Sequence, residues 1–209
     1  MKRVIYMALT LASAFSLGGC SSAITTKDLT MIEEAEATTK TTISEITAPE
    51  FSDLTIEIEG NKEVIPVRTY NSSLGYQIQM DEERFTYEAR EGVDIYTAIN
   101  PDASVYPDIF IEITKTNKSD QMNYTESLKQ LLLEENPQTK ELSDQKIGTY
   151  DVESFHLNFG NEYNSAIKKV SVVETIAAYY TIETQYFLEA AEGYGARIKA
   201  LLDTFTLND

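Results

Sequence analysis

The chain contains a single cysteine, Cys20, and this limits how any fold can be stabilised. One cysteine cannot form a disulfide within the chain, nor can it supply a metal site built from several thiolates. A folded domain must therefore depend on an apolar core. Hydrophobic residues make up 42% of the 209 residues, and a domain of about 150 residues buries roughly 70% of the surface of its unfolded chain. The composition is sufficient for one such domain.

The residues before Cys20 have the order of a secretory signal. Lys2 and Arg3 are followed by an apolar stretch that is shorter than the roughly 20 residues a transmembrane helix needs. The stretch ends at Leu17, Gly18 and Gly19. This Leu-Gly-Gly-Cys ending resembles the lipobox of bacterial lipoproteins of the Gram-positive type, which implies cleavage before Cys20 and a diacylglyceryl group on its thiol. The alternative is an ordinary signal peptide with an incidental cysteine.

The resemblance implies a location. We expect residues 1–19 to be a lipoprotein signal peptide, recognised through Leu17, Gly18 and Gly19, and Cys20 to be the lipidated residue. One acyl chain binds a membrane only marginally, so a two-chain anchor is needed for stable attachment. The lipobox therefore predicts a chain anchored by lipid at the extracytoplasmic face of the cell membrane.

Residues 20–52 are rich in threonine and glutamate, and residues 21–50 contain no glycine or aromatic residue. Such a segment cannot bury enough apolar surface to fold alone, so we expect a flexible tether. A short helix over Leu29–Ala37 is the alternative. The folded domain is expected over residues 53–209, beginning with a hairpin at about 54–70.

The charge of the chain excludes one class of partner. With 34 acidic and 17 basic residues the net charge is −17, and removal of Lys2 and Arg3 with the signal makes it two units more negative. Nucleic-acid binding needs a basic surface, and we expect none here. An acidic domain is also not expected to lie flat on anionic lipid.

Periodicity predicts an α+β domain. Alternating apolar residues indicate strands near 54–58, 64–70, 75–80, 93–99, 108–116, 141–147, 150–159, 166–174 and 177–186. Helical spacing follows Asn123, a predicted N-cap with Glu126 in a capping box, and Pro137 ends this helix. A second helix is expected over 188–203. Short turns between strands favour a mostly antiparallel sheet with the helices packed on it.

Four segments resemble PsbP-like domains: Ser73–Tyr76, Tyr180–Ile182, Glu189–Gly193 and Leu201–Phe205. The resemblance covers about residues 69–207. It implies an α/β/α sandwich and binding rather than catalysis, and it assigns no functional residue.

Motifs for catalysis, metals and cofactors are missing from the sequence. There is one histidine, His156, and neither a Gly-x-Ser-x-Gly elbow nor a phosphate-binding loop. No catalytic residue, metal site or cofactor is therefore predicted.

Tyrosine is the unusual residue type, with 13 tyrosines and no tryptophan. The cluster Tyr179, Tyr180, Tyr186 and Tyr194 is a candidate binding surface, because tyrosine is enriched at interfaces. The strand preference of tyrosine is the competing explanation.

The sequence favours a noncatalytic binding or interaction module of the cell envelope, meeting an envelope protein or a small ligand. One alternative is an envelope hydrolase that uses carboxylates or His156 in a cleft. A second is an accessory lipoprotein that binds a small ligand.

Overall fold

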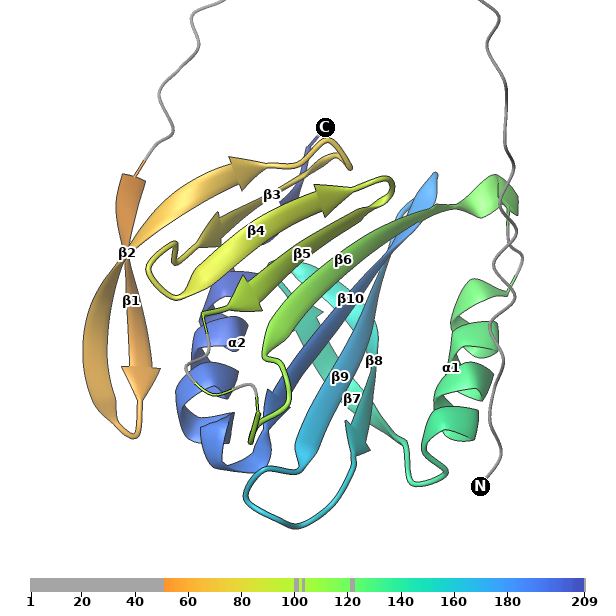
Figure 1. Ribbon diagram of the computed structural model, residues 1–209. Helices are drawn as coiled ribbons and strands as arrows, with labels where there is room; N and C mark the ends of the chain where they lie inside the picture. Colours follow the sequence, from red (N-terminus) through yellow and green to blue (C-terminus); the bar gives the residue numbers. More distant parts are fainter. Residues whose placement is uncertain (1–50, 100–101, 103, 121–122, 209) are drawn as a thin grey trace, which may run out of the picture. The chain divides into compact units, whose positions relative to one another are not determined.

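The first strands form a small antiparallel sheet (Figure 1). The computed structural model describes residues 51–99, 102, 104–120 and 123–208, which belong to one compact unit, Glu45–Asp209. The four strands of this sheet lie in the order β1, β2, β3, β11. Their bounds are Phe51–Ile58 for β1, Asn61–Asn71 for β2, Tyr76–Met80 for β3 and Thr206–Leu207 for β11. The last strand returns the end of the chain to β3, where Leu207 lies opposite Tyr76.

A larger sheet of seven strands has the order β4, β5, β6, β10, β9, β8, β7. Its strands are β4 Phe85–Arg90, β5 Val93–Ala98, β6 Phe110–Asn117, β7 Lys140–Ile147, β8 Tyr150–Asn158, β9 Ala166–Glu174 and β10 Ala178–Phe187. Neighbouring strands are antiparallel. The pairing of β6 with β10, in which Ile113 lies opposite Ile182, joins the two halves of the sequence at the centre of the sheet.

Two α-helices occur in the described residues, α1 at Tyr124–Glu135 and α2 at Ala196–Leu202. The first ends two residues before Pro137, as the ring of a proline requires. The second is preceded by a 3₁₀ turn at Leu188–Ala190 and a π-helical turn at Ala191–Gly195. None of the described helices is long and apolar enough to cross a bilayer.

Both sheets and α2 contribute to the main core. Ile78 of the small sheet, Ile111 of the large sheet and Leu201 of α2 are each fully buried there. The rings of Tyr76 and Phe205 stack with their centroids 5.2 Å apart. A second, smaller core forms under α1, where Leu132 packs against the side chains of Phe155, Leu157 and Val170.

The two cores lie on different faces of the large sheet, because successive strand residues point to opposite sides. The side chains of Ile111, Ile113 and Ile182 point into the main core, and we call the face of the large sheet that carries them the inner face. The face that carries Phe155 and Leu157 beneath α1 is the outer face.

The expected α/β/α sandwich is wrong. Strands hold 54% of the described residues and helices 19%, and the strands form two sheets instead of one sheet between helical layers. The physical reason lies in the core. The apolar residues of β2 and β3, including Ile65 and Ile78, cover much of the surface that a helical layer would otherwise cover. The resulting fold is rich in β-structure, with α2 packed into the main core and α1 on the outer face of the large sheet.

Candidate functional site

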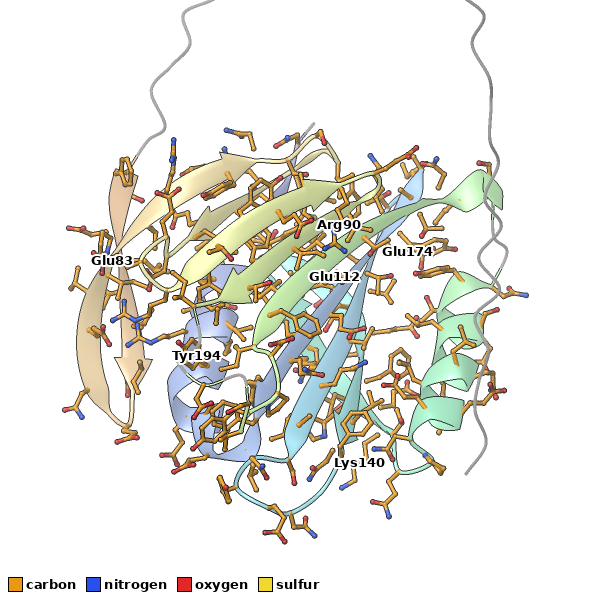
Figure 2. All side chains as sticks on the ribbon, in the orientation of Figure 1. Glu83, Arg90, Glu112, Lys140, Glu174 and Tyr194 are labelled. Carbon is orange, nitrogen blue, oxygen red and sulfur yellow. The ribbon has the colours of Figure 1, made fainter. Side chains whose placement is uncertain are left out.

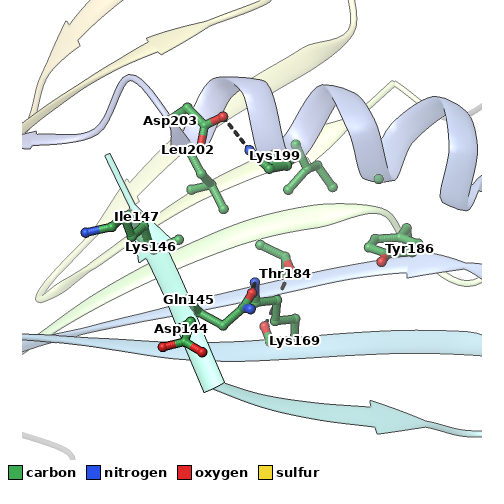
Figure 3. Close-up of a pocket in the computed structure, with 12 residues that line it drawn as sticks. Asp144, Gln145, Lys146, Ile147, Lys169, Thr184, Tyr186, Lys199, Leu202 and Asp203 are labelled. Atoms are coloured by element: carbon green, nitrogen blue, oxygen red, sulfur yellow. Dashed lines mark hydrogen bonds and ion pairs between the residues drawn. The ribbon is translucent and has the colours of Figure 1, made fainter. Parts of the chain in front are cut away.

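A cavity of about 440 Å³ opens between α2 and the inner face of the large sheet (Figure 3). Strands β7, β9 and β10 supply its floor, and α2 with the π-helical turn supplies its roof. Apolar side chains at Ile147, Ile198 and Leu202 line part of it, beside charged and polar groups. Its size is within the range of small-molecule sites, and its lining is more polar than is usual for them.

Two local features give the cavity its shape. The pairing of β7 with β8 shifts between Leu142 and Gln145, and Asp144 in this bulge has a φ of 53°. The shift sets Gln145 on the cavity side of β7. On the roof, Gly195 has no side chain, and a Cβ there would lie 3.4 Å from the ring of Tyr186. A Cβ at this position would therefore make an ordinary van der Waals contact with the ring.

Lys169 on β9 is the central basic group of the cavity. Its Nζ donates a hydrogen bond to Gln145 Oε1 at 2.8 Å (Figure 3). Within the described residues, no carboxylate lies at ion-pair distance from this ammonium. Burial lowers the pKa of Lys169 and Lys199 lowers it further, while Asp203 acts in the opposite direction. The cavity therefore holds a half-buried amine that has no counter-ion of its own.

The roof contributes a second lysine. Lys199 Nζ lies 2.6 Å from Asp203 Oδ2, one helical turn further along the chain. The pair is largely exposed, at 75% and 50% of the two side chains, so it is weak and can be exchanged for another partner. At the opposite end of the cavity, burial raises the pKa of Tyr186, which keeps its phenol protonated and available as a donor.

Basic residues continue from the cavity across the sheet. In the strand registers, Lys169 lies opposite His156, and His156 lies opposite Lys140. Lys140 is at the start of β7, where Figure 2 labels it. Burial lowers the pKa of His156, and the charges of Lys140 and Lys169 lower it further. We call Lys140, His156 and Lys169 the basic row. The two lysines flank the imidazole on neighbouring strands, so they disfavour its charged form in the unliganded protein.

The hydrogen-bond donors of this site suit an anion, and the carboxylates of Asp144 and Asp203 also line the cavity. Ammonium groups, a protonatable imidazole, the Gln145 amide and a phenol are all hydrogen-bond donors. No group of three or more histidine, cysteine, aspartate or glutamate side chains in the described chain is arranged to hold a metal ion. No hydrogen bond of the imidazole of His156 to another described side chain is found, and its charged neighbours are lysines, so a Ser-His-Asp arrangement finds no support.

The four tyrosines that the sequence analysis grouped do not share one surface. Tyr179 stacks on Tyr124 of α1 at 4.8 Å, on the outer face. Tyr180 is on the inner face, where its hydroxyl donates to the Leu74 carbonyl at 2.9 Å. Tyr186 lines the cavity, and Tyr194 lies in the π-helical turn with its ring 6.1 Å from that of Phe85 (Figure 2). These contacts place Tyr186 alone of the four in the candidate site.

The lipobox residues Leu17, Gly18, Gly19 and Cys20 lie outside the described residues, as does the expected tether up to residue 50. The expected domain start at residue 53 falls inside β1, which begins at Phe51.

Sequence reasoning missed Lys169, Lys199 and Gln145. One signal was present: Lys168 and Lys169 interrupt the apolar strand AIKKVSVVE, so one of the two lysines must face the interior. Gln145 faces the cavity because the bulge at Asp144 interrupts the alternation of side chains along β7. No residue pattern in the sequence indicates this bulge.

Comparison with known proteins leaves the family open. No protein-family model matches the chain, and no curated protein matches it. Among solved structures, a crystal structure of a protein from Bacteroides thetaiotaomicron VPI-5482 is similar at 16% sequence identity with a TM-score of 0.44. The match covers 68% of this chain and 48% of the other, so this chain spans about half the length of that protein.

Proposed function

We propose that the chain is a noncatalytic binding module whose cavity takes a small anionic ligand, such as a carboxylate or a phosphate ester. The observation that carries the proposal is Lys169, a half-buried ammonium with no carboxylate at ion-pair distance among the described residues. A cation in such a place is costly unless it is compensated. An incoming anion would supply the missing charge, and it would also accept hydrogen bonds from the Gln145 amide and the Tyr186 phenol.

The charge of the whole chain makes this arrangement selective. The net charge is −17, so most of the surface repels anions. A basic cavity in an acidic protein attracts an anion only at close range, and ligand contacts with the apolar wall at Ile147 and Leu202 would add to the binding. The expected ligand therefore has an anionic group joined to a compact apolar part.

The location of the module is part of the proposal. Cys20 would hold it at the extracytoplasmic face of the cell membrane through a diacylglyceryl anchor, as the lipobox implies. The Cys20→Ser variant should then be released from the membrane or keep its signal peptide, which fractionation and mass spectrometry would show. Membrane-bound protein with the signal removed would overturn the anchor and leave the ligand proposal standing.

The ligand proposal can be tested with the full chain purified in detergent. We expect inorganic phosphate and simple carboxylates to raise the melting temperature, because a ligand that binds only the folded state stabilises it. Lys169→Gln should weaken the binding of these anions about tenfold, the loss expected for one charge-assisted contact. Lys62→Gln is the matched control, since it removes the same charge from β2, outside the cavity. Equal losses of anion affinity in Lys169→Gln and Lys62→Gln would contradict the proposal, as would the absence of any rise in melting temperature with these anions.

A further inference from the structure

The basic row leads away from the cavity toward the edge of the large sheet. Lys169 belongs to the cavity, His156 is its direct partner on β8, and Lys140 is the direct partner of His156 on β7. Residues directly opposite each other on neighbouring strands have Cβ atoms about 5 Å apart. All three side chains are therefore on the inner face, within reach of one extended small molecule.

The neighbouring lysine on β9 shows how an ordinary lysine is accommodated in this fold. Lys168 points to the outer face, where its Nζ lies 3.0 Å from Glu135 Oε1 and 3.0 Å from Glu183 Oε1. On the inner face, the half-buried Lys169 and the exposed Lys140 have no carboxylate at ion-pair distance in the described part of the chain, although acidic residues outnumber basic ones two to one. Lys168 and Lys169 are adjacent in the chain, yet Lys168 has two carboxylates at ion-pair distance and Lys169 has none among the described residues.

One anionic group is not enough to neutralise this row. A group held between Lys169 and the Gln145 amide would lie over β8, because Lys169 is on β9 and Gln145 is on β7. Gln145 lies opposite Val152 and Lys140 lies opposite His156, four residues further along β8, so Lys140 would remain roughly 13 Å from Gln145 along the strands at about 3.3 Å per residue. A second anionic group between His156 and Lys140 would compensate the charge of Lys140 and favour the charged form of the His156 imidazole, which the two lysines now disfavour.

We infer that the ligand carries two anionic groups, the first bound at Lys169 in the cavity and the second between His156 and Lys140. This inference rests on the proposed anion-binding function of the cavity. Its chemistry is shared by diphosphates and by dicarboxylates, and the pair of groups distinguishes such ligands from a simple phosphate or monocarboxylate.

The single histidine gives a direct readout, because the imidazole C–H signals in an NMR spectrum of the full chain belong to His156. A nearby anion favours the charged imidazole, so binding of a second anionic group should move the titration of His156 to higher pH. We expect pyrophosphate or succinate to cause this shift, and inorganic phosphate or acetate to cause a much smaller one. The two pairs of probes separate phosphate from carboxylate ligands.

Two variants test the second subsite. His156→Gln and Lys140→Gln should each weaken pyrophosphate or succinate binding about tenfold and leave phosphate and acetate binding nearly unchanged. Lys62→Gln is again the control for loss of one charge. The second subsite would be disproved if phosphate binding depended on Lys169 but the affinity for pyrophosphate and succinate did not change in the His156→Gln and Lys140→Gln variants. The proposed function would then still hold. If no anion binds at all, the proposed function itself fails.

Discussion

The phenol of Tyr76 on the small sheet donates a 2.7 Å hydrogen bond to Asp94 Oδ2 on the large sheet. Ser72 Oγ donates to the same oxygen, and Tyr87 donates to Oδ1 at 2.9 Å. Asp94 is 1% exposed. A single carboxylate therefore accepts three hydroxyl donors and joins the start of β3 in the small sheet to β5 in the large sheet.

Replacement of this carboxylate should be costly. Asp94→Ala leaves the buried hydroxyls of Ser72 and Tyr76 without their acceptor, and each such group costs about 1–3 kcal/mol. We expect a loss of roughly 3 kcal/mol in the free energy of unfolding, measured by urea denaturation. Tyr87→Phe removes one donor at the exposed end of the cluster and should cost about 1 kcal/mol. Equal effects of the two changes would show that the cluster does not hold the sheets together.

Gly148, in the turn between β7 and β8, lies against the end of α2. Its φ is 55°, its N–H donates to the Leu202 carbonyl at 3.0 Å, and a Cβ would lie 2.1 Å from the Phe205 carbonyl oxygen. Gly148→Ala should therefore lower the free energy of unfolding by about 3 kcal/mol or more, because backbone must move to make room. Gly60 is the control: its φ is 76°, and a Cβ added there would have nothing within 4 Å.

The Gly60→Ala variant isolates the conformational cost of a positive φ. That cost is about 1–2 kcal/mol for a residue other than glycine. The additional loss in the free energy of unfolding of Gly148→Ala, compared with Gly60→Ala under the same urea denaturation, is then the steric contribution. Equal destabilisation would mean that Phe205 can retreat without loss, and the close packing of this turn on α2 would be unimportant.

Glu63 of β2 connects the small sheet to α2. Arg197 Nη2 lies 2.6 Å from Glu63 Oε2, and Arg84 Nη2 lies 3.4 Å from Glu63 Oε1. Arg197 is 13% exposed, and its Nη1 has no partner in the described structure, so the arginine depends on this carboxylate. We expect Glu63→Gln to cost about 1–2 kcal/mol in urea denaturation, below the value for a fully buried pair because Glu63 is partly exposed.

The control for Glu63 is an exposed pair. Lys146 and Asp151 are 2.6 Å apart but 58% and 87% exposed, and Asp151→Asn should cost less than about 0.5 kcal/mol. A larger cost for Asp151→Asn than for Glu63→Gln would contradict the view that α2 is held by Glu63.

Period-two alternation located most of the strands, because their inner residues must be apolar to enter the main core. It failed at β4, where Thr86, Glu88 and Arg90 are exposed at a sheet edge and little apolar pattern remains. A proline such as Pro66 is expected at an edge or a bulge. It lies in β2, between β1 and β3, but pairing with β3 begins only at Arg68, so Pro66 has one strand neighbour.

Helix ends were harder to predict than helix existence. Asn123 precedes α1 as expected, but it is in the left-handed region and makes no side-chain cap, and Glu126 accepts a hydrogen bond from Gln130 instead of closing a capping box. The helix expected over 188–203 is divided by the π-helical turn that contains Gly193 and Gly195. The candidate site could not be found by pattern, since it forms where α2 packs over β7, β9 and β10, and this packing follows from the order of the strands in the sheet.

The position of His156 in the basic row predicts a pH dependence of stability. Burial lowers the pKa of His156 below its ordinary value of 6.5, and Lys140 from β7 and Lys169 from β9 lower it further. The unfolded chain therefore binds a proton at this residue more readily than the folded chain. Stability should be greatest above pH 6.5 and fall as the pH decreases toward the pKa of the folded state.

The contribution of His156 can be separated from that of the carboxylates by substitution. Melting temperatures of the wild type and of His156→Gln should be compared between about pH 7.5 and about pH 5.5, in a buffer without small anions that could bind the row. We expect the wild type to lose more stability than the variant over this interval. Inorganic phosphate bound at Lys169 should reduce the difference, because it favours the imidazolium. If the melting temperatures of the wild type and of His156→Gln changed with pH by the same amount, Lys140 and Lys169 would not act on His156.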